Sequence, residues 1–288
     1  MNTSRDKRIS VIIPNYNYGK YLKKRVQSIL KQTYPIYEII ILDDNSTDES
    51  KLIIDKIISD VMVRMPELNV RFVKNDVNSG KPMAQWKKGI ELATGEYIWI
   101  AEADDLCSKY FLKEVMKGFD DPEVVLSYAE SMIINESGFV IAPNFRWSRD
   151  REKTGHYKAS YIKDGYREVE EIMAVRCTIP NVSAVVFRKD AIDMNVLEKA
   201  IEFSQVGDWY LYVNILKNGK IAYNHKALNK FRIHKGSKTA DARKDGVHYD
   251  EIVAIHKWLA TKFNLDEFVT RRMLAEQKRI AKRMKISN

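Results

Sequence analysis

Short apolar runs and amphipathic segments alternate over the first hundred residues of the chain. The apolar runs predict buried strands, which we place at residues 9–14, 37–42, 70–73 and 96–101. Between them, apolar side chains recur at helical spacing, which predicts helices over residues 19–32, 46–62 and 81–93. Continuous apolar strands that alternate with helices are typical of a mostly parallel sheet covered on both faces, so we expect an α/β fold.

The pattern of the second half is less regular. We expect strands at residues 124–128, 138–141, 182–187, 221–224 and 230–234, and a helix at residues 210–216. Residues 143–168 are rich in aromatic and charged side chains and are expected to form a loop over a site. Beyond residue 254 the pattern again predicts helix.

Polar residues follow each of the first four predicted strands. They occupy residues 15–17, 43–45, 75–81 and 102–105. Because the carboxyl ends of parallel strands meet at one edge of the sheet, where ligands bind in such folds, we expect these four groups to converge on one site.

The last of these groups places three carboxylates, Glu102, Asp104 and Asp105, within four residues. Like charges this close repel unless a cation or a proton compensates them. Hard oxygen ligands suit Mg2+ or Mn2+, which commonly bridge diphosphates. A solvated turn with helix-capping acids would produce the same pattern, so both interpretations stay open at this point.

Three further motifs are candidates for the site, and two of them have a second interpretation. The turn at residues 78–81 resembles a short phosphate-binding turn, although it lacks the spacing of a P-loop. Asp208, before a predicted helix, is either a general base or a helix N-cap. Arg232 and His234 would hold a diphosphate or a metal, or belong to a solvated turn.

Composition narrows the class of protein. The net charge is +9, of which residues 257–288 carry +6, with nine Lys and Arg against three acids. The rest is only mildly basic, so we expect no nucleic-acid partner.

Cys107 and Cys177 have no metal-type spacing and fit a reducing compartment. No apolar run reaches the roughly 20 residues of a membrane helix, and the polar start is unlike a signal peptide. We therefore expect a cytoplasmic protein.

Taken in order, the motifs resemble those of the family 2 inverting glycosyltransferases with the GT-A fold. The matching segments are residues 11–17, 28–35, 38–48, 78–81, 93–98, 102–105, 207–209 and 232–237. The resemblance covers roughly residues 8–238 and implies a GT-A type sheet flanked by helices. One departure is Glu102, where the family more often has Asp, and the longer side chain suggests a contact to ribose rather than to metal.

The resemblance also implies roles for individual residues. Donor-binding roles fall to Pro14, Tyr16, Asn17, Asp44, Asn78, Gly80, Lys81, Glu102 and Arg232, with the first two and Asp44 at a nucleobase that is most often uracil. The metal ligands would be Asp104, Asp105 and His234. Asp208 matches the catalytic base.

The implied activity is a metal-dependent glycosyltransferase of hexosyltransferase type. With Mn2+ or Mg2+, it would move sugar from a nucleotide-sugar, as a rule a UDP-sugar, to a hydroxyl of a growing bacterial-type surface polysaccharide or lipid-linked glycan. One alternative is a sugar-phosphate nucleotidyltransferase, which would need a Gly-rich loop that is missing after the first strand. Another is a non-catalytic sugar- or nucleic-acid-binding module, which would leave the convergent acids unexplained.

The expected domains are a glycosyltransferase domain over residues 1–238 and a basic helical extension over residues 239–288. Within the first, residues 1–106 would bind the nucleotide-sugar and residues 107–238 the acceptor. In the extension, Val269, Met273, Ile280 and Met284 form one apolar stripe. Such a helix either lies on an anionic membrane, which would place the protein at the inner face of the membrane, or packs on the domain with a solvated basic face.

Overall fold

The computed structural model describes residues 7–151, 155–236 and 247–284. In this part of the chain ten strands form one mixed sheet, in the order β3-β2-β1-β4-β9-β6-β10-β5, with β7 beside β6 and β8 beside β10. The strands are β1 (Ile9–Asn15), β2 (Glu38–Asp43), β3 (Asn69–Lys74), β4 (Tyr97–Ile100), β5 (Leu106–Cys107), β6 (Val124–Ile134), β7 (Val140–Ala142), β8 (Tyr161–Asp164), β9 (Val185–Arg188) and β10 (Lys220–Arg232).

The first four strands are parallel, as the alternating pattern predicts. They are connected by α1 (Gly19–Leu30), α2 (Ser50–Arg64) and α3 (Pro82–Leu92). Every residue of β1 and β2 is buried, which explains why these strands are uninterrupted apolar runs. In the register of the sheet Asn15 lies opposite Asp43, so the polar ends of adjacent strands meet at one edge.

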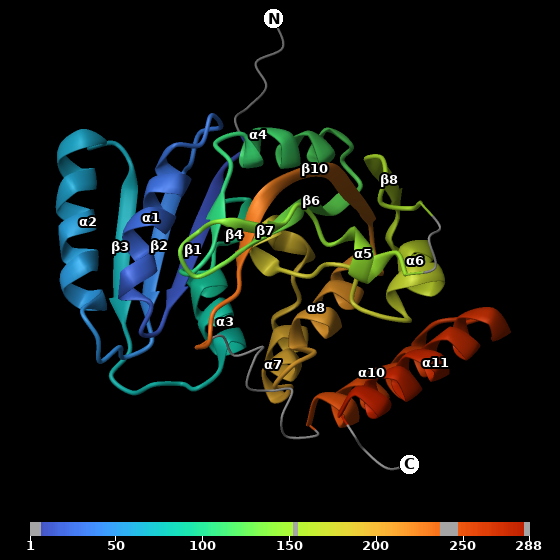
Figure 1. Cartoon of the computed structure of the whole chain (residues 1–288). Coiled ribbons are helices and arrows are strands. Elements are labelled where there is room, and N and C mark those ends of the chain that lie inside the picture. The colour runs from blue at the N-terminus through green and yellow to red at the C-terminus, as the bar shows by residue number, and fades with distance from the viewer. Residues whose placement is uncertain (1–6, 152–154, 237–246, 285–288) are drawn as a thin grey trace, which may run out of the picture.

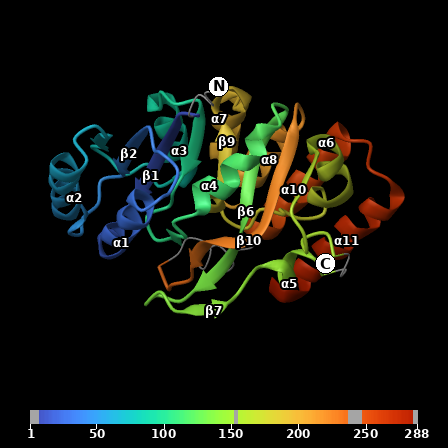
Figure 2. The same cartoon turned by 90° about the horizontal axis from the view of Figure 1, so that it is seen from above.

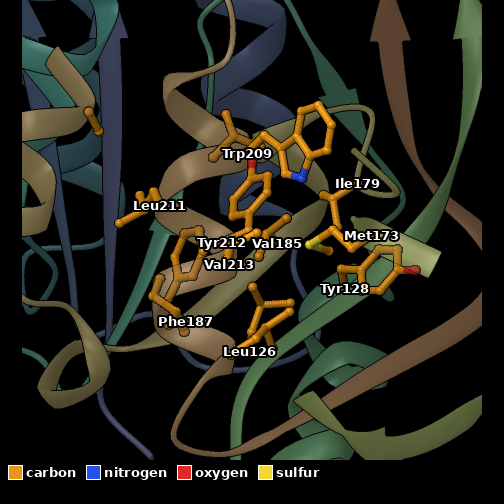
Figure 3. Close-up of a cluster of buried hydrophobic side chains, with 14 of the residues drawn as sticks. Leu126, Tyr128, Met173, Ile179, Val185, Phe187, Trp209, Leu211, Tyr212 and Val213 are labelled. Atoms are coloured by element: carbon orange, nitrogen blue, oxygen red, sulfur yellow. The ribbon is translucent and has the colours of Figure 1, made fainter. Parts of the chain in front are cut away.

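Helices cover both faces of the sheet (Figure 1). One face packs against α1, α2 and α4 (Phe111–Val115). The other packs against α3, α7 (Met194–Glu202) and α8 (Gly207–Leu216). Figure 3 shows the centre of this second core, where Trp209 and Tyr212 of α8 lie among side chains of the strands such as Val185 and Phe187.

The second half differs from its sequence pattern in two places. Residues 143–168, expected as a loop over the site, contain α5 (Arg146–Arg149), β8 and α6 (Gly165–Glu168). These elements have four residues each, too few for a recognisable period, and β8 pairs with β10. The runs at residues 221–224 and 230–234 belong to one strand, β10, whose pattern is interrupted by register shifts between Asn224 and Asn229.

The C-terminal extension forms two helices, α10 (Val247–Lys262) and α11 (Glu267–Met284). Figure 2 shows both helices on the side of the molecule opposite α1 and α2. Val269, Met273 and Ile280 are buried against the body, and Met284 packs on the same cluster. The apolar stripe therefore covers the domain. Among the described residues, no helix is long and apolar enough to pass through a bilayer. The expected boundary at residue 238 lies outside the described residues, and the division at residue 106 stays a prediction.

Candidate active site

A cavity of about 240 Å³ opens at the carboxyl ends of β1, β2 and β4. Ten of the residues predicted for the site line it, namely Pro14, Tyr16, Asp44, Asn78, Lys81, Glu102, Asp104, Asp105, Asp208 and Arg232. The expected convergence of the strand ends is therefore observed, and the late Asp208 and Arg232 join them. The role of each residue stays a prediction. Asn17, Gly80 and His234 are not among the lining residues that the structure describes.

The two adjacent acids at the end of β2 face different partners. Both carboxylate oxygens of Asp43 are used within the loop, where they accept hydrogen bonds from Asn15 and from the backbone and hydroxyl of Ser46. Asp43 thus shapes the turn that leads into α2. Asp44 lies at the cavity instead, so it is the one of the two carboxylates that a ligand in the cavity could reach.

The Asp44 carboxylate accepts hydrogen bonds from the loop between β3 and α3 and from α3 itself. Its Oδ1 accepts hydrogen bonds from the Asn75 side chain at 2.7 Å, the Ser79 backbone at 2.9 Å and the Gln85 amide at 2.8 Å. Its Oδ2 accepts from the Ser79 hydroxyl at 2.7 Å. This many donors fix the orientation of the carboxylate, which leaves remaining lone pairs of Oδ2 for a ligand.

The turn at residues 78–81 is stabilised by its own contacts. Gly80 has a φ of +68°, a conformation that favours glycine, and its N–H donates to the side chain of Asn78. The ammonium of Lys81 donates to the carbonyl of Ile201 at 2.9 Å, at the end of α7. The turn that was predicted to bind phosphate is therefore also connected to the second half of the chain.

Asn17, predicted to bind the donor, braces a loop instead of lining the cavity. Its φ is +57°, and its side-chain oxygen accepts backbone N–H bonds from Thr47 at 2.8 Å and Asp48 at 3.2 Å. This geometry holds the β1–α1 and β2–α2 loops together. A donor contact by Asn17 is a prediction that these bonds do not favour.

Glu102 is oriented by a tryptophan. Its Oε1 accepts a hydrogen bond from the indole N–H of Trp86 at 2.7 Å. Burial, and then the negative charge of Asp104, raises the pKa of Glu102 to about 8. The ionised form of Glu102 is therefore disfavoured by its surroundings, and a nearby cation would stabilise it.

Asp104 and Asp105 have different surroundings. Oδ2 of Asp104 lies 2.9 Å from the imidazole Nε2 of His234, which is buried. The Asp105 oxygens accept hydrogen bonds from the Arg232 backbone N–H at 2.9 Å and the Asn181 amide at 2.8 Å. Burial and the neighbouring Asp104 raise the pKa of Asp105 to about 6. The Asp104 side chain is the more exposed of the two, at 14%, whereas Asp105 is buried, and metal binding by either carboxylate stays a prediction.

The Arg232 guanidinium contacts the acidic loop at residues 102–105 through a backbone carbonyl of that loop. Its Nε donates to the carbonyl of Asp104 at 2.6 Å, and its Nη1 donates to the carbonyls of Asn135 and Glu136 at 2.9 and 2.8 Å. The guanidinium also lies over the ring of Tyr21. These contacts brace the loop that carries the acids, so a direct contact of Arg232 with the donor stays a prediction.

The site can be tested for its fit to a divalent cation. Among the described residues, no group of three or more His, Cys, Asp and Glu side chains is placed to hold a metal ion. The Asp104 carboxylate and the His234 ring nitrogen would supply two ligands, and diphosphate oxygens would supply others, as is common for Mg2+ and related ions. Burial, and then the charge of Asp104, raises the pKa values of Glu102 and Asp105, so a nearby cation would stabilise the ionised forms of both carboxyl groups. The residues therefore fit a cation that binds together with a diphosphate.

Asp208 lies in the first turn of α8, with Val206 at the N-cap position. Its Oδ1 accepts the backbone N–H of Trp209 at 2.7 Å. Burial raises the pKa of Asp208 to about 6, which suits a general base at neutral pH. The preceding Gly207 allows close packing, because a Cβ there would lie 2.5 Å from the carbonyl oxygen of Ala200.

Several lining residues were missed from the sequence. Tyr18, Gln85, Trp86 and Asn181 all line the cavity. Gln85 lies one helical turn after Lys81, so helical spacing from that motif would have found it. Asn181 belongs to the irregular middle of the chain, where no pattern pointed to it.

A buried cation near the acids was also missed. Arg25 of α1 is fully buried, and its guanidinium has no hydrogen-bond partner among the described residues. It lies 5.1 Å from the Trp99 ring, and its charge works against the rise in the pKa of Glu102 and Asp105. A charged residue on an otherwise apolar helix face was the signal in the sequence.

The chain is similar in sequence to a family of known proteins. The family described as glycosyl transferase family 2 matches residues 10–171, more than half of the chain. The glycosyltransferase GlyG of Streptococcus pneumoniae serotype 4 is 38% identical over 120 residues, which cover 41% of this chain and 38% of GlyG. The UDP-Glc:alpha-D-GlcNAc-diphosphoundecaprenol beta-1,3-glucosyltransferase WfaP of Escherichia coli is 26% identical over 248 residues, 85% of each protein. The chain thus matches less than two fifths of GlyG but most of WfaP.

Solved structures with the same fold include two with bound donors. Staphylococcus aureus TarS 1–349 in complex with UDP-GlcNAc has a TM-score of 0.63 and 20% identity, covering 96% of this chain and 71% of that one. The mannosyltransferase PcManGT of Pyrobaculum calidifontis, in complex with GDP-Man and Mn2+, has a TM-score of 0.63 and 17% identity, covering 96% and 70%. At these identities the likeness establishes the fold.

Proposed function

Because the chain belongs to glycosyl transferase family 2 and has the GT-A fold, we propose that it transfers a sugar from a nucleotide-diphosphate donor to a hydroxyl acceptor with inversion. A UDP-sugar is the first candidate donor. The observation that carries the proposal is the single cavity that Asp44, the acidic loop at residues 102–105 and Asp208 line together.

The donor would lie across the strand ends. Asp44, with its fixed carboxylate, would accept a hydrogen bond from the nucleobase beside Pro14 and Tyr16. Asp104 and His234 would hold the divalent cation, Mn2+ or Mg2+, which would supply positive charge against the diphosphate. Glu102, held by Trp86, would contact the ribose.

Asp208 would then act as the base. Its carboxylate takes the proton of the acceptor hydroxyl, and the hydroxyl oxygen forms a bond to the anomeric carbon of the sugar. The bond from that carbon to the diphosphate oxygen breaks on the opposite face, and the nucleoside diphosphate leaves with the electron pair. One displacement of this kind inverts the anomeric configuration.

The proposed acceptor is a glycan, either a growing bacterial-type surface polysaccharide or a lipid-linked one. Support comes from two relatives, since WfaP is named for a diphosphoundecaprenol acceptor and TarS for a poly(ribitol-phosphate) acceptor. Residues 107–238 would form the acceptor half and residues 1–106 the donor half. The relatives in the same family give no support to a nucleotidyltransferase or a non-catalytic module.

A peripheral location at the inner face of the membrane also belongs to the proposal. Because the apolar stripe of α11 is buried, such contact would rest mainly on basic side chains, for example Arg271 and Lys278, and would weaken as salt rises. The exposed Phe268 and Leu274 of the same helix would add apolar contact. Sedimentation with anionic vesicles at low and high salt would test it, and equal recovery with neutral vesicles would argue against it.

The function itself is tested with a panel of UDP- and GDP-sugars and Mn2+. We expect release of UDP from one UDP-sugar and loss of that release when EDTA is in excess. Full activity in excess EDTA would rule out the metal assignment. Release of GDP from a GDP-sugar, without release of UDP from any UDP-sugar, would show that the donor carries guanine instead of uracil. The assignment as a transferase would then remain.

A further inference from the structure

A carboxylate of the C-terminal extension accepts hydrogen bonds from the backbone just before Asp208. Glu251 of α10 accepts N–H hydrogen bonds from three successive residues, Ser204 at 2.6 Å, Gln205 at 2.7 Å and Val206 at 3.2 Å. Bonds from backbone N–H groups to an ionised carboxylate are short and strong. The loop between α7 and α8 is thereby fixed up to the second residue before Asp208.

The same helix also contacts the residue after Asp208. The ring of His256 in α10 meets the Trp209 ring edge to face, with centroids 5.6 Å apart. His256 is buried, and burial lowers its pKa. Its Nε2 lies 3.2 Å from the carbonyl of Val175 and its Nδ1 lies 2.9 Å from the amide of Gln277. A neutral ring with its proton on Nε2 satisfies both contacts, so the ring orientation is defined.

The extension is attached to the body by contacts away from Asp208. Glu276 of α11 accepts two hydrogen bonds from Arg151 at 2.9 and 3.0 Å. It also lies 3.6 Å from Arg176 and is bound by Arg279 of its own helix. The buried stripe of α11 adds apolar contact with the body. The hairpin of α10 and α11 is therefore held firmly on the body, and this fixes the positions of Glu251 and His256.

We propose that this C-terminal hairpin positions Asp208 for proton transfer, with Glu251 as the main positioning residue. The inference rests on the proposed role of Asp208 as the base. A base must come within about 2.6–3.2 Å of the proton it removes, and a misplacement of about 1 Å can cost about a hundredfold in rate. Glu251 before Asp208 and His256 after it hold the backbone on both sides. No residue of α10 or α11 is among the described residues that line the cavity, so the hairpin would act on Asp208 from outside the cavity.

The first test is the variant Glu251→Gln in the full chain, since Gln keeps the shape but loses the charge and one acceptor. Its matched control is Glu267→Gln on the same hairpin, where Glu267 is exposed and pairs only with Arg271 of its own helix among the described contacts. We expect Glu251→Gln to lower kcat for UDP release about 10- to 100-fold with little change in the donor KM. Glu267→Gln should match the wild type.

A second measurement does not depend on activity or on the identity of the donor. Hydrogen exchange of the amides at residues 204–206 should quicken in Glu251→Gln and not in Glu267→Gln. The carboxyl group of Asp208, followed by ¹³C NMR, should titrate at a lower pH in Glu251→Gln, because a loosened loop admits water. Glu251→Asp, which keeps the charge, should recover part of the exchange protection.

The outcomes separate the two proposals. If the wild type releases no nucleotide, the proposed function fails, and exchange and titration still decide whether Glu251 fixes the loop. If Asp208→Asn is fully active, Asp208 is not the base, and the positioning role proposed for Glu251 fails with it. If the wild type is active and Asp208→Asn is not, a normal kcat in Glu251→Gln overturns the positioning role. A changed melting temperature with unchanged kcat and unchanged Asp208 titration would overturn it as well.

Discussion

Nε2 of His234 lies 2.9 Å from Oδ2 of Asp104, although the two residues are 130 positions apart in the chain. The contact forms because β10, which ends at Arg232, delivers His234 to the loop after β4. The Tyr18 ring meets the His234 ring edge to face, with centroids 5.3 Å apart. A carboxylate and an imidazole held this closely make a pair that either binds a cation together or orients one ligand through the other.

His234→Ala should weaken Mn2+ binding. Removing a ligand, or a group that orients one, commonly costs about 10- to 100-fold in metal affinity. Calorimetric titration of Mn2+ in the presence of UDP measures this. His225→Ala is a matched control, because His225 contacts Ser160 at an exposed position. Equal Mn2+ affinity in His234→Ala and the wild type would remove His234 from the metal site.

Asp208→Asn should reduce kcat by about 10²- to 10⁴-fold, the usual range for a lost general base. Asn keeps an oxygen that can accept the Trp209 N–H, so the start of α8 should stay intact. Donor affinity should survive, because Asp208 acts on the acceptor. Steady-state rates and equilibrium binding of UDP, measured on the same preparation, separate these effects. Near-normal turnover would take Asp208 out of the role.

The pH dependence of kcat should reflect the ionisation of Asp208. Burial raises its pKa from 3.8 to about 6, and only the ionised form accepts a proton. The rate should therefore rise with pH, reach half of its plateau near pH 6 and level above about pH 7, being about tenfold lower at pH 5 than on the plateau. Burial, and then the charge of Asp208, raises the pKa values of the neighbouring Cys177 and Tyr212, so both stay neutral over this range. If the residual kcat of Asp208→Asn still rose with pH over the same range, the pH dependence would belong to another group.

The raised pKa of Asp208 also predicts that the stability of the fold decreases over the pH range in which kcat increases. A carboxyl whose folded pKa is raised binds its proton more tightly in the folded state, so stability falls as pH rises from about 4 to about 6. Asp208→Asn removes this loss. The variant should match the wild type near pH 4 and be more stable at pH 7.5, by at most about 3 kcal/mol for a shift of about two units. Urea unfolding at the two pH values measures the difference, and a variant equally stable at pH 7.5 would show that Asp208 carries no such penalty.

Gly207→Ala should lower stability and kcat together. The added Cβ would lie 2.5 Å from the carbonyl oxygen of Ala200, so α7 and α8 must move apart next to Asp208. Overpacking of this kind typically costs about 1–3 kcal/mol. Ser59→Ala on the exposed side of α2 serves as control. Wild-type melting temperature and kcat in Gly207→Ala would show that the close packing is not needed.

The first half of the fold was readable because three of its four strands, β1, β2 and β4, are buried along their whole length. Such strands leave a long apolar run in the sequence, and β1 and β2 match it to within one residue. The second half was harder, since β8 and α6 have only four residues each. Elements of that length are held by their neighbours rather than by a period of their own.

The candidate site was predicted where polar residues follow strands. Asp44, Glu102 and Asp104 come from such positions and do line one cavity. Asn181 and Tyr18 were not singled out, because a lone polar or aromatic residue is ordinary until its neighbours are known. Arg232 was expected at the diphosphate, yet its guanidinium is bound by backbone carbonyls. Only the path of the chain determines which carbonyls an arginine can reach.

By itself, the sequence determined that strands and helices alternate and that acidic groups gather at the strand ends, because these features depend on local periodicity and on the rule that parallel strands end together. The tertiary structure decided which of two adjacent acids turns to the cavity, as with Asp43 and Asp44. It also decided that the C-terminal helices lie behind Asp208, with Glu251 bound to the backbone before it. Such contacts join residues distant in sequence, and their formation depends on packing that no local pattern encodes.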